Sequence, residues 1–365
     1  MDVVAACPDV EWLQDLMKGL IDGNNGDSYS QDAVESCEQL AKCISEKILK
    51  PDPDMDKKRL VACFTTLLLI ANVRPGLVTH HVKLLHPYLN FKIKTAHDLQ
   101  IVIKTEKILE LTVPLMHHPS ADWLKLLEMD LMKIIMFSAN EAIEGAIACL
   151  GALVNKVSKK YSVVWECFSK YYQFVKRIVD QDNVEETMQS SKKVIFLRSI
   201  QTIGYLHKTF DFDQKEIVEA KNVTFNIKEE TYEKLLSLVP IEMLDLQTNV
   251  LASLGHLMVQ EPSFMLLEMT KALYDGVLTS ENDKLRCVVL NNFDNYLKEE
   301  DKRLSELERQ NVKDKKKDAG QKEGQKIGSK SLPNKEGMNK LVRFFATATR
   351  VDYKLLLFFS EKRRK

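Results

Sequence analysis

The sequence predicts an all-α protein, a solenoid of stacked antiparallel helix pairs. Three observations lead there: a glycine recurs inside similar apolar helical stretches, helical periodicity runs through most of the chain, and chain-breaking residues are few. The recurring glycines are Gly151, Gly204 and Gly255, with spacings of 53 and 51 residues. A glycine inside a helix costs about 1 kcal/mol relative to alanine. Three of them in matching phase therefore indicate that a neighbouring helix packs closely at each one.

Composition supports the same class and narrows the function. The chain has 365 residues, of which 45% are hydrophobic, with only 13 glycines and 10 prolines. Such a composition favours long helices over strands and turns. Lys plus Arg equals Asp plus Glu at 52 each. No global field would steer the protein to nucleic acid or membrane, so any electrostatic function must come from local patches.

The spacing of apolar residues along the chain predicts where each helix lies. Ile143, Ile147, Leu150 and Val154 recur at intervals of three and four residues, which lines one face of a helix. Prolines next to a capping serine mark several boundaries, as at Pro119-Ser120. The spacing predicts helices at 9–21, 31–49, 56–73, 76–89, 96–117, 121–138, 141–158, 161–180, 192–210, 228–238, 241–259, 263–279 and 282–310.

Two of these helices carry extra information. The run Ile134 to Phe137 is apolar all round, which predicts a helix covered on both sides by neighbouring repeats. The helix from Leu285 changes character along its length. Its first half offers Val289 and Phe293 for packing, whereas residues 298–310 are mostly charged, and we expect them to project into solvent.

The domain organisation follows from where the periodicity stops. Residues 1–310 are predicted to form one helical-repeat array. Residues 311–337 are rich in lysine and have no apolar face, which predicts a disordered linker. Residues 338–365 are predicted to form a C-terminal helix with a basic tail, Lys362-Arg363-Arg364-Lys365.

The cysteines and histidines indicate neither disulfides nor a metal centre. The seven cysteines are scattered on apolar helix faces without a C-x-x-C pair, which is typical of reduced intracellular thiols. The adjacent pairs His80-His81 and His117-His118 lack a third ligand at i+4, and neighbours on a helix point about 100° apart. We therefore expect solvated or capping histidines and no metal.

The sequence predicts neither an enzyme nor a bound cofactor, because it lacks the nucleotide-binding, nucleophile and zinc-protease motifs. The N-terminus carries no signal-peptide pattern, and the longest apolar stretch, 60–73, is shorter than the roughly 20 residues that span a bilayer. We expect a soluble, non-secreted protein.

One local patch is a candidate interface. The sequence between Asn155 and Val179 contains six basic residues and a single acid, Glu166. Residues 187–210 contain no acid. Phosphate contacts need only cations on one exposed surface. The alternative is that Trp165, Phe168 and Tyr172 are core and the lysines merely solvate the outer face. The candidate contact residues are Lys156, Lys159, Lys160, Lys170, Lys176, Arg177, Lys192, Lys193 and Arg198.

Specific runs resemble a known family. Asp130-Leu131-Met132-Lys133, the stretch from Cys149-Leu150-Gly151 to Val157, and Val164-Trp165-Glu166-Cys167-Phe168 are similar to the C-terminal repeat region of Nipped-B-like proteins, the large subunit of the cohesin loader. Further matches, such as Glu261-Pro262-Ser263, extend the resemblance over about residues 10–310. The resemblance implies that the solenoid is of the HEAT type.

The resemblance also implies a function. Family members are nuclear, hook-shaped HEAT-repeat proteins that load the cohesin ring onto chromatin. They stimulate its ATPase by gripping the ATPase heads, the kleisin subunit and DNA, and the loader itself is not an enzyme. A smaller accessory subunit binds a long N-terminal region that this chain lacks. We therefore expect a fragment, a truncated gene model or a shortened isoform.

The sequence as a whole predicts a non-catalytic scaffold of the cohesin loader, located in the nucleus, that binds cohesin and DNA. The alternative is a HEAT-type transport or coat adaptor that binds peptides in its concave face. Salt-sensitive binding to duplex DNA separates the two, because only the first reading expects it.

Overall fold

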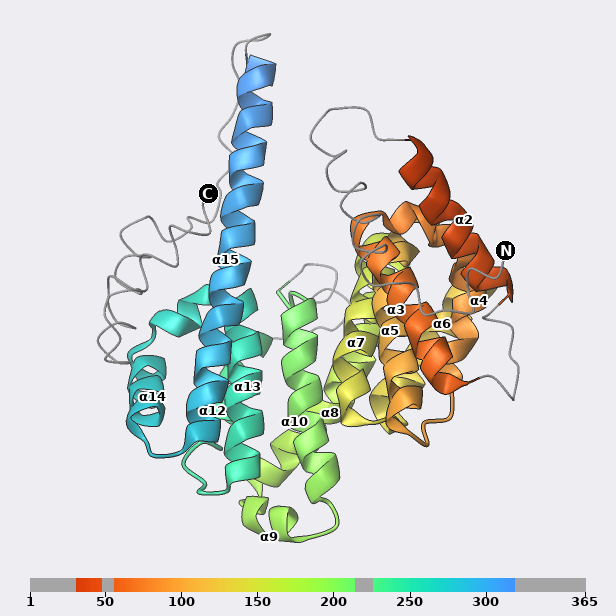
Figure 1. Cartoon of the computed structure of the whole chain (residues 1–365). Coiled ribbons are helices and arrows are strands. Elements are labelled where there is room, and N and C mark those ends of the chain that lie inside the picture. The colour runs from red at the N-terminus through yellow and green to blue at the C-terminus, as the bar shows by residue number, and fades with distance from the viewer. Residues whose placement is uncertain (1–30, 48–55, 214–225, 319–365) are drawn as a thin grey trace. The chain divides into compact units, whose positions relative to one another are not determined.

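The computed structural model describes residues 31–47, 56–213 and 226–318, and within these ranges all regular secondary structure is helical (Figure 1). The chain divides into two compact units. Unit 1 comprises Met1–Ile178 and Val194–Thr224, and unit 2 comprises Val179–Lys193 and Phe225–Lys365. Within each unit neighbouring helices pack as adjacent pairs, which confirms the predicted all-α, HEAT-type class.

Unit 1 is built on three long helices that lie side by side (Figure 1). They are α3 (Lys57–Val73), α5 (Ala96–Thr112) and α7 (Asn140–Ala152). Between α5 and α7 in sequence comes α6 (Ala121–Phe137), which packs on α7 and on η4. The other elements are α2 (Gln31–Lys47), η2 (Pro75–Leu77), η3 (Thr79–His81), α4 (Val82–Leu85), η4 (His86–Asn90), η5 (Val113–Leu115), η6 (Leu153–Ser158), α8 (Tyr161–Asp180) and α10 (Lys193–Thr209).

Unit 2 repeats this plan with fewer helices. Its central pair is α13 (Leu244–Gln260) and α15 (Asp283–Asp318), which pack side by side (Figure 1). The helix α12 (Ile227–Leu236) packs on α13, and α14 (Glu268–Thr279) packs on α15. The unit also contains α9 (Val184–Gln189) and η7 (Pro262–Leu266).

Side-chain caps explain where the long helices begin. The Asp56 carboxylate accepts a hydrogen bond from the Lys58 N–H, and the Ser120 hydroxyl accepts one from the Trp123 N–H. At α5 the Thr95 hydroxyl and the Asp98 carboxylate exchange bonds with each other's backbone N–H, a complete capping box. Each cap satisfies N–H groups that have no partner within the helix.

Two of the recurring glycines, Gly151 and Gly255, lie where helices approach each other, as predicted. Gly151, Gly204 and Gly255 are all buried. A Cβ atom added at Gly151 would lie 2.3 Å from Thr209 Cγ2 at the end of α10. One added at Gly255 would lie 2.1 Å from Asn292 Cγ on α15. A larger side chain fits these two positions only if the Thr209 or Asn292 side chain, or the helix that carries it, shifts.

The structure differs from the predicted elements in four places. Predicted helix 76–89 is broken into η2, η3, α4 and η4; Pro87, which lacks an N–H for helical bonding, accounts for the last of these breaks, between α4 and η4. The short α9 was not predicted. Helix α15 reaches Asp318, so the first residues of the predicted linker are helical, consistent with the fair helix propensity of lysine. The prediction that neighbouring repeats cover both sides of the helix at Ile134 to Phe137 is wrong for Phe137, because its side chain is 78% exposed.

Several predictions fall outside the described residues: helix 9–21, most of the linker 311–337, and the helix with its basic tail at 338–365. Among the described helices none combines the length and the apolar character that a bilayer crossing requires. The described cysteines are all free thiols, and Cys37, Cys63, Cys149 and Cys167 are buried.

Candidate nucleic-acid and partner interface

The first candidate site is the turn between α7 and α8, which carries three exposed lysines: Lys156, Lys159 and Lys160. We call these three residues the basic edge. Helix α7 ends in the π-helical segment η6, and Lys159 then adopts a left-handed backbone conformation with φ of 55°. That residue reverses the chain direction into α8. The sequence between Asn155 and Trp165 contains no acid, so the turn presents positive charge only.

The C-terminus of the helix favours a lysine at position 159. The Lys159 N–H bonds to the Val154 carbonyl at 3.0 Å, and its ammonium donates to the Asn155 carbonyl. Cations are favoured at helix C-termini, where carbonyl groups point outward and the dipole is negative. Lys159 is thus partly engaged in capping, whereas Lys156 and Lys160 are simply exposed.

The turn after α5 lies beside the basic edge, because η5 contacts η6. It carries the exposed pair His117 and His118, the latter with a φ of 48°. In the ranges that the structure describes, no group of three or more His, Cys, Asp and Glu side chains is placed to hold a metal ion.

Three more predicted contact residues lie along α8 rather than in the turn. Lys170 is exposed, and its ammonium lies 3.2 Å from the Met136 sulfur on α6. Lys176 and Arg177 each lie 5.9 Å from an aromatic ring, those of Tyr172 and Phe174 respectively. These cations are packed against neighbouring side chains, but Lys170 and Arg177 keep exposed surface that a ligand could reach.

The aromatic side chains between these cations are mostly core. Phe168 and Tyr172 are buried and their rings stack 5.1 Å apart. The Phe168 ring also packs at 4.6 Å against that of Phe212, while Trp165 is half-buried. The structure therefore supports the alternative reading for this stripe: it holds α8 onto the unit and does not offer rings for base stacking.

Arg198 has a structural role that sequence reasoning missed. Its guanidinium donates hydrogen bonds to the carbonyls of Ile134, Ile135 and Ser138 and to the Asn140 side chain. The first two are among the last carbonyls of α6; Ile134 also accepts the N–H of the C-cap residue Ser138, and the guanidinium supplies a partner at the end of the helix where carbonyls lack one. Half-buried and committed to these acceptors, Arg198 anchors α10 to the end of α6.

Lys192 and Lys193 belong to unit 2, unlike the other predicted contacts. The Lys193 ammonium forms an ion pair at 2.7 Å with Asp245 at the start of α13, whereas Lys192 is exposed. The structure brings together Lys156, Lys159 and Lys160 in one turn and Lys170, Lys176 and Arg177 along one helix. Arg198 and Lys193 are held by partners within their own units.

Two buried carboxyl groups were also missed. Asp130 on α6 lies 3.0 Å from His86 Nε2 and accepts hydrogen bonds from Asn90 at 2.7 Å and Lys133 at 2.8 Å. Burial alone would raise the pKa of Asp130, but these donors lower it below its usual range. Burial lowers the pKa of His86, and nearby Asp130 opposes that effect. The network joins α6 to η4.

Glu106 is the second such group. It lies fully buried on α5, where neither carboxyl oxygen has a hydrogen-bond partner among the described residues. Burial raises its pKa well above the usual value, although nearby Lys107 opposes this. A Cβ atom added at Gly145 of α7 would lie 2.3 Å from Glu106 Oε2. The signal in the sequence was one acid among the mostly apolar buried positions of 101–109.

The curated proteins that this chain is similar to are Nipped-B-like proteins. No protein-family model matches the chain. Nipped-B-like protein B of Danio rerio is 38% identical over 325 residues, which is 85% of this chain and 11% of that protein. The Nipped-B-like proteins of Homo sapiens and Mus musculus are 36% identical over 322 residues, or 84% of this chain and 11% of theirs. The chain thus spans about 11% of the length of the curated relatives it matches.

Solved structures add little. A crystal structure of an engineered protein is similar over 72% of this chain and 97% of that chain, at 14% sequence identity. Its TM-score is 0.28, too low to bear on the fold or the function.

Proposed function

Because this chain is homologous over 85% of its length to a segment of Nipped-B-like proteins, we propose that it is a non-catalytic scaffold of the cohesin loader. In this role it helps to place cohesin on chromatin by binding cohesin subunits and DNA in the nucleus. The family resemblance and the homology carry the proposal. The accessory subunit of the loader would bind a region outside this chain.

The basic edge is the proposed DNA contact. Lys156, Lys159 and Lys160 are exposed, lie in one turn and have no acid beside them in the sequence. Three such cations can neutralise phosphates without reading bases. The chain as a whole is neutral, so binding should be weak, indifferent to sequence and lost steeply as salt rises, by about 0.9 logarithmic unit per phosphate neutralised.

The test is the triple variant Lys156→Glu, Lys159→Glu, Lys160→Glu, measured by fluorescence anisotropy with duplex DNA of two unrelated sequences. We expect weaker binding to both duplexes and a flatter salt dependence. The matched control is Lys58→Glu, Lys83→Glu, Lys92→Glu, which reverses the same charge at three other exposed lysines of unit 1. If the control weakens binding as much as the test variant, only net charge matters and the basic edge is not the contact.

Binding to cohesin needs its own test. Purified cohesin ATPase heads with the bound kleisin should be retained by the immobilised full chain, and the chain should raise their ATPase rate in the presence of DNA. A chain that binds neither heads nor kleisin would contradict the scaffold role. A chain that binds cohesin but not DNA would leave that role intact and remove the basic edge from it.

A further inference from the structure

Helix α6 presents an uncovered apolar face. Leu126 and Met129 are each 47% exposed, and Phe137 at the helix end is 78% exposed. The spacing of these residues places them on one side of the helix, together with Lys125 and Lys133. We call these five residues the outer face of α6. Exposed side chains of this size are normal singly, but three on one side of a helix, with lysines beside and between them, favour an interaction surface.

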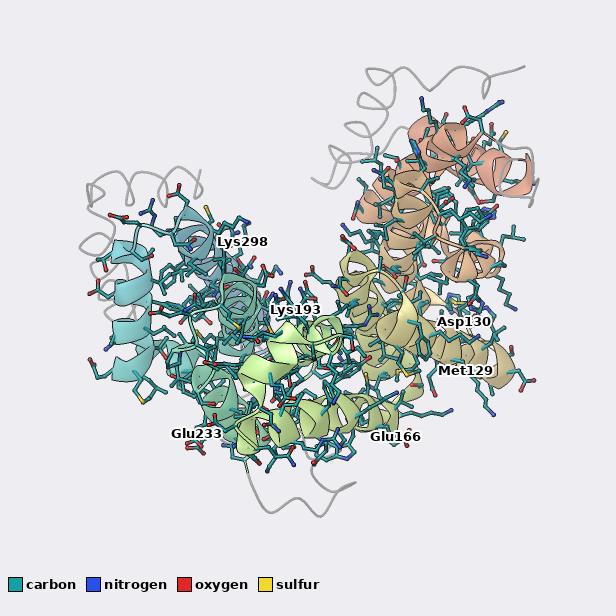
Figure 2. All side chains as sticks on the ribbon, turned by 90° about the horizontal axis from the view of Figure 1, so that it is seen from below. Met129, Asp130, Glu166, Lys193, Glu233 and Lys298 are labelled. Atoms are coloured by element: carbon teal, nitrogen blue, oxygen red, sulfur yellow. The ribbon has the colours of Figure 1, made fainter. Side chains whose placement is uncertain are left out.

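The opposite side of the same helix is already packed. Leu127, Leu131, Ile134 and Ile135 are buried there, together with Asp130. Figure 2 labels Asp130 and its neighbour Met129 on this helix. Met129 is exposed although its neighbour Asp130 is buried, so the two sides of the helix have different environments. A helix that is apolar on both sides is stable when both are covered. In the described part of unit 1 only one side of α6 is covered.

The charges around the outer face are mostly positive, although Asp122 lies at its start and Lys133 forms an ion pair with the buried Asp130. Lys125 and Lys133 are exposed on it, and Lys170 of α8 reaches Met136 at the same end of the helix. Among the acids of α6, Asp130 is buried and Glu128 is half-buried, which leaves only Asp122 exposed, in the first turn. Carboxylates on a partner would therefore meet cations along most of the outer face.

A second pair of exposed apolar side chains lies at the start of α10, the helix that Arg198 joins to the end of α6. Val194 and Ile195 at the start of α10 are 66% and 55% exposed. They precede by one helical turn Arg198, whose guanidinium holds the last carbonyls of α6. Residues one turn apart share a side of a helix, so Val194 and Ile195 lie on the side of α10 that carries Arg198.

We propose that the outer face of α6 docks an acidic amphipathic helix of a partner protein. Side chains spaced three and four residues apart form ridges that pack into the grooves of a second helix. Leu126, Met129 and Phe137 offer such contacts over three turns of α6. Acidic residues beside the partner's apolar stripe would meet Lys125, Lys133 and Lys170. The inference rests on the proposed scaffold role but does not depend on the basic edge, which lies on another turn of unit 1.

The probe is a synthetic 18-residue helical peptide with leucines at i, i+3, i+4 and i+7 and glutamates beside them. Its counterpart has the same leucines with lysines in place of the glutamates. Fluorescence anisotropy against the full chain should show at least tenfold tighter binding of the acidic peptide. That preference should decrease with salt, because the rim charges are exposed.

Two pairs of variants locate the binding. Met129→Ser with Phe137→Ser should weaken binding of the acidic peptide at least tenfold, whereas the control Leu84→Ser, at an equally exposed leucine on α4, should leave it unchanged. Lys125→Glu with Lys170→Glu should reverse the preference between the two peptides. Circular dichroism should show the same helix content in all variants, since these side chains are exposed.

Several outcomes would overturn the proposal: equal binding of both peptides, binding by neither, or binding unaffected by Met129→Ser with Phe137→Ser. A dimer of the full chain in light scattering that Phe137→Ser dissociates would show that a second copy occupies the face instead. The basic-edge triple variant should bind the acidic peptide like the parent chain. Loss of DNA binding and loss of peptide binding are therefore separate results.

Discussion

At the scale of single residues, Glu106 stands out as a carboxyl group placed where a charge is costly. Its side chain is fully buried on α5, without a hydrogen-bond partner among the described residues. Burial raises its pKa well above 4.5, the ordinary value for glutamate. The group is therefore protonated in the folded chain at pH values where the unfolded chain has already lost that proton.

This predicts a pH dependence of stability with a definite sign. Below about pH 4.5 Glu106 is protonated in both the folded and the unfolded chain, so its ionisation does not lower stability. As pH rises from there toward the raised pKa, the free energy of unfolding falls by up to about 1.4 kcal/mol per pH unit. Glutamine at position 106 cannot ionise. The melting temperature of Glu106→Gln relative to that of the parent chain should therefore increase as pH rises from 5 to 8. Glu141→Gln, at an exposed position, is the control. Parallel curves for Glu106→Gln and the parent would contradict the assignment.

Lys159 gives a second prediction at this scale. Its φ of 55° costs a residue with a side chain about 1–2 kcal/mol, and glycine avoids that cost. Lys159→Gly loses the ammonium bond to the Asn155 carbonyl, which is exposed and worth less. We expect the variant to unfold at the same or a higher temperature while its DNA affinity falls. A clear drop in melting temperature would show that the lysine side chain matters more to the turn than the backbone strain.

At the scale of elements, the helices are held at the distance that their buried glycines allow. Gly151→Leu places bulk where Thr209 Cγ2 already lies 2.3 Å from an added Cβ atom. Such overpacking should lower the free energy of unfolding by about 1–3 kcal/mol. Gly276→Leu is the control, because nothing lies within 4 Å of an added Cβ atom at that helical position. Urea unfolding of both variants tests the difference, and equal midpoints would mean that α10 can simply move away.

The helices themselves were largely predictable from the sequence, because apolar spacing and caps are local signals. Helix α8 occupies the predicted 161–180, and α3 begins one residue after the predicted start. The exceptions also have local causes, such as Pro87 in 76–89. The short α9 was missed because six residues are too few to show a helical period.

The candidate site was less predictable, because its residues are defined by distant partners. Arg198 was grouped with the DNA contacts by sequence proximity, yet its acceptors lie about sixty residues earlier on α6. The partner of Lys193, Asp245, is likewise far away in sequence. Lys156, Lys159 and Lys160 share one turn because they are close in sequence, so their proximity could be predicted, as could that of Lys170, Lys176 and Arg177 on α8. The outer face of α6 could not be found either, since an apolar run does not reveal which side lacks a neighbour.

At the scale of the whole molecule, repeat architecture predicts that damage stays local. Each helix pair contacts mainly its neighbours, so stability is close to a sum of repeat and interface contributions. Asp130→Ala removes the acceptor of the buried His86 and of Asn90, which should cost about 3 kcal/mol. Hydrogen exchange should accelerate in α6, η4 and α7 and stay unchanged in α13 and α15 of unit 2.

The exposed Lys133 is the control for that experiment. Lys133→Ala removes one surface partner of Asp130 but leaves the contacts from His86 and Asn90, so exchange should change little. Faster exchange throughout unit 2 in Asp130→Ala would mean that the two units unfold as one cooperative body.

The contact between Glu106 and Gly145 constrains how this protein can evolve. Because a Cβ atom at position 145 would lie 2.3 Å from the buried carboxyl oxygen, a larger residue at 145 requires the Glu106 side chain to move or to be shorter, whereas position 106 can shorten without any change at 145. Across orthologous genes glycine should therefore be retained at 145 more often where 106 is glutamate. The compensated double mutant Glu106→Ala, Gly145→Ala should accordingly be more stable than the sum of its single mutants.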